Sequence, residues 1–140
     1  MPVITLPPAL HRPETRRAIA LTLTAVLSLV IFIGALIPLT VPPAVPGTDK
    51  QYHLIAFAAL TLPCAALYPR ALIWVLPLIV GQAGLIEIVQ PYVNRMREWA
   101  DFVADLKGVG IGLILGIMVQ ITGTAILRKT RSPAPRTQGR

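Results

Sequence analysis

Four long apolar stretches, separated by short polar segments, set the pattern of this chain. The first runs from Ala18 to Leu39, and as a helix it would span about 33 Å, enough for the apolar core of a bilayer. Three further stretches of the same character follow at Gln51–Tyr68, Ala71–Gln90 and Lys107–Leu127. The pattern predicts an all-α protein, folded as a four-helix transmembrane bundle.

The segments outside these helices divide the chain into three parts. Residues 1–17 are a predicted N-terminal segment, residues 18–127 the membrane domain, and residues 128–140 a basic, disordered tail. A connector containing Pro42, Pro43, Pro46 and Gly47 follows the first helix. The first apolar stretch is longer than the roughly 7–15 residues of a signal-peptide core, which favours a retained helix over a cleaved signal peptide.

The composition indicates an integral membrane protein. Mean hydropathy is +0.68 and 14% of the residues are charged, against roughly 25% in soluble domains. The formal net charge of +7 comes mostly from the two ends of the chain, which fits the positive-inside rule better than nucleic-acid binding. We therefore expect both termini in the cytoplasm. The basic residues that flank the first and last helices are Arg12, Arg16, Arg17, Arg128, Lys129 and Arg131.

In this topology, most polar residues between the two ends of the chain fall at the outer membrane face. Glu87 is the costliest of them, because it lies inside an apolar helix and needs a partner there. We expect that partner to be His53, with Lys50 or Arg95 as alternatives. The candidate binding residues are Asp49, Lys50, His53, Glu87, Gln90, Arg95, Asp101 and Asp105. They could form either a ligand pocket or an ion-pair network that only holds the helices together.

Several kinds of chemistry can be weighed on these residues. His53, Glu87, Asp101 and Asp105 have metal-ligating side chains, but the chain has no HExxH motif and no cysteine among them, so we predict no metal and no cofactor. No serine lies near the outer site, which disfavours a serine nucleophile. General acid–base chemistry by His53 with Glu87 or Asp101 stays open.

Gly108, Gly112 and Gly116 recur every four residues on the last helix. Small residues at this spacing let a second helix approach closely. The stripe predicts either packing within the bundle or an interface to a second copy or a larger membrane complex.

The ordered set of polar residues resembles the VanZ-like family of small membrane proteins. The match consists of an Asp-Lys-x-x-His helix start, a Glu-x-x-Gln helix end, and a later arginine, aspartate and glycine, over about residues 48–116. The matching residues are Asp49, Lys50, His53, Glu87, Gln90, Arg95, Asp101, Asp105 and Gly108. This chain departs from the family at Val93-Asn94, where Pro-Gly is common, and at Asp105, where asparagine is usual.

The resemblance implies a multi-pass protein of a bacterial inner membrane, with a link to the cell envelope and no settled biochemical activity. We expect an envelope accessory protein whose outer polar site binds a lipid headgroup or a cell-wall precursor. Two alternatives stay open: a membrane enzyme that acts on such a substrate by acid–base chemistry, and an assembly subunit that docks through its glycine face. In each case the expected partners are membrane lipids or membrane proteins and not nucleic acid.

Overall fold

The computed structural model describes residues 12–37 and 48–131, which form helices and contain no strand. The elements are α1 (Pro13–Leu36), α2 (Thr48–Leu67), η2 (Pro69–Ala71), α3 (Leu72–Val89), η3 (Gln90–Val93) and α4 (Trp99–Arg131). The prediction of an all-helical chain with four long helices is confirmed. Most of the predicted irregular N-terminal segment, the Pro-Gly connector and most of the predicted disordered tail lie outside the described residues.

Three predicted helix starts are wrong, and of these α2 begins at Thr48 rather than Gln51. Helix α1 begins at Pro13 rather than Ala18, because proline suits the first helical position, where its missing N–H is not needed. Helix α4 begins at Trp99, eight residues before the predicted Lys107, and it continues to Arg131. Polar residues interrupt the apolar pattern at the start of α4 without ending the helix, and Asp101 in its first turn is favourable to the helix dipole.

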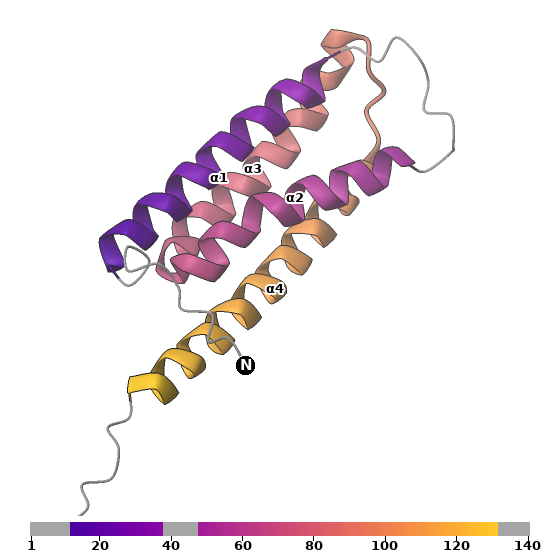
Figure 1. Ribbon diagram of the computed structural model, residues 1–140. Helices are drawn as coiled ribbons and strands as arrows, with labels where there is room; N and C mark the ends of the chain where they lie inside the picture. The colour runs from indigo at the N-terminus through magenta and orange to yellow at the C-terminus, as the bar shows by residue number, and fades with distance from the viewer. Residues whose placement is uncertain (1–11, 38–47, 132–140) are drawn as a thin grey trace, which may run out of the picture.

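Helix α2 is the centre of the bundle. It contacts α1, α3 and α4, and its longest contact is with α4. Figure 1 shows α1 and α3 lying side by side, whereas the C-terminal half of α4 extends beyond the other helices. The buried apolar core, where α2, α3 and α4 meet, includes Phe57, Leu60, Ile79, Ile86 and Val109.

The α2–α4 contact is a close crossing of two backbones, built on the glycine stripe. A Cβ added at Gly108 would collide with the carbonyl of Leu54, and one added at Gly112 would collide with the backbone of Ala58. Gly116 lies against Ala65 in the same way. The stripe therefore faces α2 of the same chain, and α2 and α4 could not approach this closely if these positions carried side chains.

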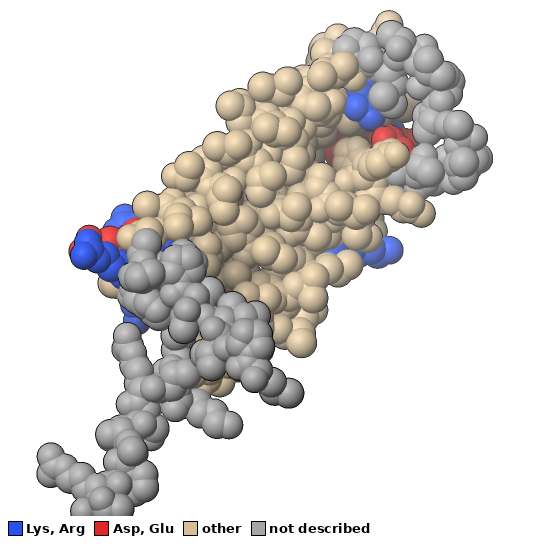
Figure 2. Space-filling view, viewed as in Figure 1, with Lys and Arg blue, Asp and Glu red and all other residues tan. Residues whose placement is uncertain are grey.

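Three helical segments are long and apolar enough to cross a membrane. They are Pro13–Leu36, Pro69–Val93 and Trp99–Ile126, with mean hydropathies of 2.6, 2.1 and 2.0. On the face shown in Figure 2, the described charged residues gather toward the two ends of the molecule, with an uncharged surface between them. These features indicate a membrane protein. Helix α2 falls outside this group, since its first two turns carry Asp49, Lys50, Gln51 and His53.

Polar contacts tie α1 to its neighbours within the apolar region. The hydroxyl of Thr24 donates to the carbonyl of Leu60 at 3.5 Å and lies 3.3 Å from the sulfur of Cys64. Ser28 donates to the side-chain oxygen of Gln82, whose amide donates back to the Ser28 carbonyl at 2.9 Å. These reciprocal bonds satisfy buried polar groups across helices and fix how α1 sits on α2 and α3.

Candidate functional site

The structure gathers the predicted binding residues at one end of the bundle. The first two turns of α2 supply Asp49, Lys50 and His53, and the end of α3 with η3 supplies Glu87 and Gln90. Arg95 lies in the connector before α4, and the first turns of α4 supply Asp101 and Asp105. Because four separate elements meet here, helix packing, not sequence proximity, sets the site's geometry.

A buried histidine–aspartate pair lies at the centre of the site. Nδ1 of His53 and Oδ1 of Asp105 are 2.9 Å apart, and the side chains are 9% and 0% exposed. His53 is the predicted partner of Glu87; the two side chains lie close together, but the hydrogen bond of His53 is to Asp105. Asp105 takes the position because the glycine crossing brings the first turns of α4 directly against α2.

Glu87 binds the start of α4 instead. Its Oε2 accepts the backbone N–H of Glu98 at 3.1 Å, immediately before the first residue of the helix. The first N–H groups of a helix have no partner within the helix, and a carboxylate there also interacts favourably with the positive end of the helix dipole. Glu87 thereby connects the end of α3 to the beginning of α4.

Lys50 forms the exposed rim of the site. Its ammonium donates to Glu98 at 2.9 Å and lies 3.8 Å from Oδ1 of Asp101. The hydrogen bond to Glu98 raises the pKa of Lys50, so the ammonium stays charged at neutral pH. Since the Lys50 and Glu98 side chains are 42% and 46% exposed, we assign this pair little stability.

Arg95 joins three parts of the chain. Its Nη1 donates to the carbonyl of Ala35 on α1 at 3.2 Å, and its Nη2 donates to Oδ1 of Asp49 at 3.4 Å. The turn before it depends on Asn94, whose φ of 62° is the left-handed conformation that glycine adopts most readily. Asparagine tolerates this conformation better than most residues, which explains how Asn94 can serve at this turn.

Four buried oxygens of the cluster have no hydrogen-bond partner among the described residues. Their residues are between 0% and 5% exposed, so bulk water does not satisfy them either. Leaving such an acceptor unpaired costs on the order of 1–3 kcal/mol. These oxygens can therefore bind a cation or accept hydrogen bonds from a ligand with several donor groups. The atoms are Oε1 of Glu87, Oε1 of Gln90, Oδ1 of Asp101 and Oδ2 of Asp105.

A cavity of about 280 Å³ opens beside the cluster, chiefly between α1 and α2. One part of its wall is apolar and comes from Ile31, Ala35, Ala56, Phe57 and Ile86. The other part carries Asp49, Tyr52, His53 and Arg95. A second hollow of about 270 Å³, beside Glu87 and Trp99, lies between α3 and α4. The first cavity is amphiphilic, with polar and charged groups alongside an apolar wall.

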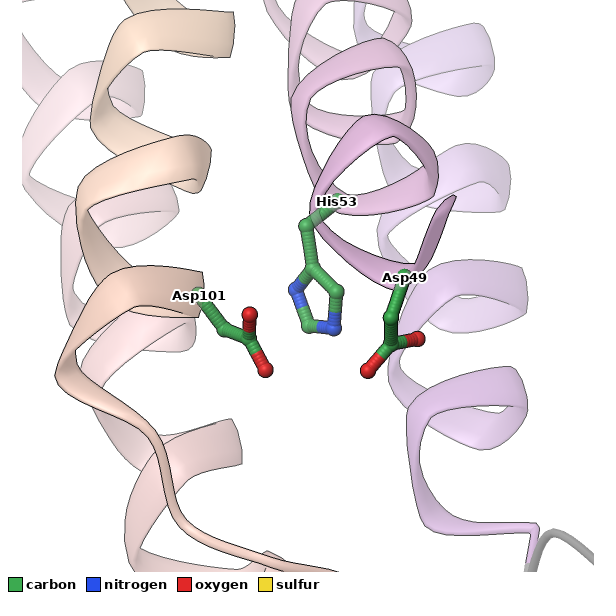
Figure 3. A group of neighbouring side chains, drawn as sticks. All are labelled: Asp49, His53 and Asp101. Atoms are coloured by element: carbon green, nitrogen blue, oxygen red, sulfur yellow. The ribbon is translucent and has the colours of Figure 1, made fainter. Parts of the chain in front are cut away.

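Two overlapping sets of side chains have their ligand atoms within 4.8 Å of one another. One set is Asp49, His53 and Asp101, and the other is His53, Glu87 and Asp105. Figure 3 shows the His53 ring between the carboxylates of Asp49 and Asp101, which come from different helices. Histidine nitrogen and carboxylate oxygen are both common ligands of divalent transition metals.

Sequence reasoning missed two participants in the site. Glu98 binds Lys50 through its side chain and Glu87 through its N–H, and the Ala35 carbonyl accepts from Arg95. Glu98 lies three residues before Asp101, at the turn that precedes α4, so a correct start for α4 would have indicated it. Nothing in the sequence distinguishes the Ala35 carbonyl, because every residue has one.

Comparison of the chain with protein-family models, with curated proteins and with solved structures found no match. The function is therefore inferred from the geometry of the site.

Proposed function

We propose that this protein is a VanZ-like, four-helix integral membrane protein that binds the head of a phosphate-bearing lipid. The amphiphilic cavity between α1 and α2 carries the proposal. Its apolar wall suits a hydrocarbon chain, and Arg95 and His53 suit a polar head. Ligand sites with a largely apolar lining and a few placed polar groups are typical of small-molecule binding.

Arg95 is the residue that favours phosphate. A guanidinium has five N–H donors in a planar fork that matches a phosphate group, and it stays charged at any physiological pH. Two donor groups of Arg95 contact Ala35 and Asp49. The Asp49 contact, at 3.4 Å, is long for a charge-assisted bond, so a phosphate could replace it at small cost.

Membrane topology follows from the charges at the two ends of the bundle. We propose that α2 also crosses the membrane, shielded by its neighbours, and that the polar cluster lies on the outer side. Arg16 and Arg17 lie at the opposite end, where Arg16 donates to the Ala66 carbonyl and Arg17 stacks on Tyr68. This basic end would then be cytoplasmic, as the positive-inside rule requires.

Labelling introduced cysteines with a membrane-impermeant thiol reagent tests the orientation. Glu98→Cys should react in intact cells, and Ser132→Cys should react only after the cells are opened. Native Cys64 is fully buried and gives a low background. The reverse labelling pattern would contradict the proposed orientation.

Lipid titration of the purified protein tests the binding function. In maltoside detergent with EDTA, phosphatidylglycerol or undecaprenyl phosphate should raise the melting temperature, whereas uncharged diacylglycerol should not. Arg95→Ala should lose the shift, and Arg70→Ala, an exposed arginine near the other end, should keep it. Equal shifts with diacylglycerol would contradict phosphate recognition, and the two phosphate lipids separate a bilayer lipid from a cell-wall carrier.

A second candidate function is catalysis on the same lipid. The observation that favours it is the His53–Asp105 pair, because a carboxylate on Nδ1 orients the ring and leaves Nε2 to act as a general base. The His53 side chain also lines the cavity. An enzyme would be supported if the wild-type protein released inorganic phosphate from undecaprenyl phosphate or diphosphate and His53→Gln did not. Binding without turnover would support the accessory role.

A further inference from the structure

The polar cluster holds more buried carboxylate than its cations can balance. Glu87, Asp101 and Asp105 are at most 5% exposed, and Asp49 adds a fourth carboxylate. The cations in contact are Lys50, which is shared with Glu98, Arg95, which bonds to Asp49, and His53 when its ring carries two protons. Buried carboxylates without partners are costly, so an additional positive charge would stabilise the folded state.

The geometry points to a missing cation held from two helices. The ligand atoms of Asp49, His53 and Asp101 lie within 4.8 Å of one another, and Figure 3 shows the ring between the two carboxylates. Around a metal with bonds of about 2.1 Å, neighbouring ligand atoms are roughly 3–3.5 Å apart. Small side-chain rotations would close the set. Asp101 is 3% exposed, and its Oδ1, which lies 3.8 Å from the Lys50 ammonium, accepts no hydrogen bond from the residues described here.

We propose that Asp49, His53 and Asp101 bind a divalent transition metal, Zn²⁺ or Mn²⁺, at this end of the bundle. Asp105 is the positioning residue: it accepts the Nδ1–H of His53 and leaves the Nε2 lone pair for the metal. A carboxylate behind a metal-bound histidine is a common arrangement that fixes the tautomer and the orientation of the ring. The nitrogen ligand favours these ions over Mg²⁺ and Ca²⁺, which prefer oxygen.

This inference revises the expectation of no metal, which rested on the absence of a local motif. The two ligand-bearing elements are about fifty residues apart in the chain, so no short motif could show the site. The inference does not rest on lipid binding, although the site shares Asp49 and His53 with the cavity. A bound dication would also add positive charge beside Arg95, where a lipid phosphate would bind.

Metal titration of the full chain tests the site. Tag-free protein in maltoside detergent, with no added lipid, is first stripped of metal with EDTA and passed into chelator-free buffer. It is then titrated calorimetrically with ZnCl₂ and with MnCl₂. We expect one saturable site per chain for at least one of the two ions, and a higher melting temperature when it is filled. His53→Gln and Asp101→Asn should each weaken metal binding by about tenfold or more. Asp105→Asn should weaken it to a similar extent, because Asp105 orients the His53 ring.

Two controls separate the site from other effects of charge. Glu14→Gln removes a carboxylate in the first turn of α1, outside the site, and it should bind like wild type. His11→Gln changes the other histidine and should also leave binding unchanged. If Asp101→Asn does not fold, Asp49→Asn replaces it, because Asp49 is 33% exposed and tolerates change better.

Three results would overturn the proposal. They are no saturable binding of either ion to the wild type, unchanged binding in both His53→Gln and Asp101→Asn, and a preference for Ca²⁺ over both Zn²⁺ and Mn²⁺. The lipid titration contains EDTA and the metal titration contains no phosphate lipid. Failure of one proposal is therefore distinguishable from failure of the other.

Discussion

The contact between α2 and α4 has two halves of opposite character. In one half, Gly108, Gly112 and Gly116 let the two backbones touch, with no side chain of α4 between them. In the other half, His53 on α2 faces Asp101 and Asp105 on α4, and buried oxygens lack partners. The same pair of helices thus contains both a close backbone crossing and two of the four buried oxygens that lack a hydrogen-bond partner among the described residues.

The glycine half of the α2–α4 contact positions the polar half. Gly108 is three residues from Asp105, and its contact on α2, Leu54, is the residue after His53. The distance between the helices at the His53–Asp105 pair is therefore set one turn away, by backbone contact. Proteins commonly place unsatisfied or strained groups at functional sites and stabilise them through packing elsewhere.

Filling the glycine half should have the largest effect. Gly112→Leu forces a side chain into the backbone of Ala58, which has no room to move, and should cost about 3 kcal/mol or more and abolish the folded bundle. Gly110→Leu is the matched control, because a Cβ at Gly110 meets no described atom within 4 Å. Melting curves in detergent should separate the two variants, and equal stability would contradict a stabilising role for the close crossing of α2 and α4.

Breaking the pair in the polar half should come next. His53→Ala leaves Asp105 buried with neither oxygen paired, and removing one partner of a buried charged pair costs about 3–5 kcal/mol. A measurable bundle with a lower melting temperature is expected in metal-free detergent. Asp105→Asn, which keeps a hydrogen-bonding group and removes the charge, should be far milder. If the two variants melted together, the charge on Asp105 would not matter to the fold.

A smaller effect is expected at Glu87. In Glu87→Gln the side-chain oxygen can still accept the N–H of Glu98, and the new amide replaces an oxygen with no described partner. The free energy of unfolding should change by less than about 1 kcal/mol. Glu87→Leu, which removes the acceptor, should cost more. A collapsed melting curve for Glu87→Gln would show that the carboxylate charge holds α3 to α4.

An effect as small as that at Glu87 should come from the turn that leads into the polar half. Asn94 has a φ of 62°, and a side chain without a local hydrogen bond pays about 1–2 kcal/mol for this conformation. Asn94→Ala should therefore be less stable by about 1 kcal/mol, and Asn94→Gly should be close to neutral. Chemical unfolding of the three proteins checks the order, and a more stable alanine variant would contradict it.

The sequence allowed the helical class, the number of long helices and the residues of the polar cluster to be predicted. Hydrophobic stretches mark helices directly, and a polar residue near the end of such a stretch is visible without a structure. The spacing of the three glycines likewise indicated a close crossing, although not which helix would fill it.

Pairing within the site could not be predicted, for physical reasons. His53 meets Asp105 rather than Glu87 because of how α4 rotates against α2, and no sequence period encodes that rotation. The start of α4 was misplaced because Lys107 and Asp105 interrupt the apolar run, although charge alone does not end a helix. The contribution of Ala35 is a backbone carbonyl and has no signature in a side-chain pattern.

Helix α2 carries a consequence for how the chain is built into a membrane. It is the long helix that falls short of the hydropathy of a membrane span, yet Phe57, Leu60, Thr61 and Cys64 on it are fully enclosed by neighbours. Its polar first turns disfavour entry into lipid on their own, and α4, its main partner, is synthesised after α1, α2 and α3. We expect α2 to be held in place only once α4 has been made, so that a protein truncated before α4 would be recognised by quality-control proteases as unassembled.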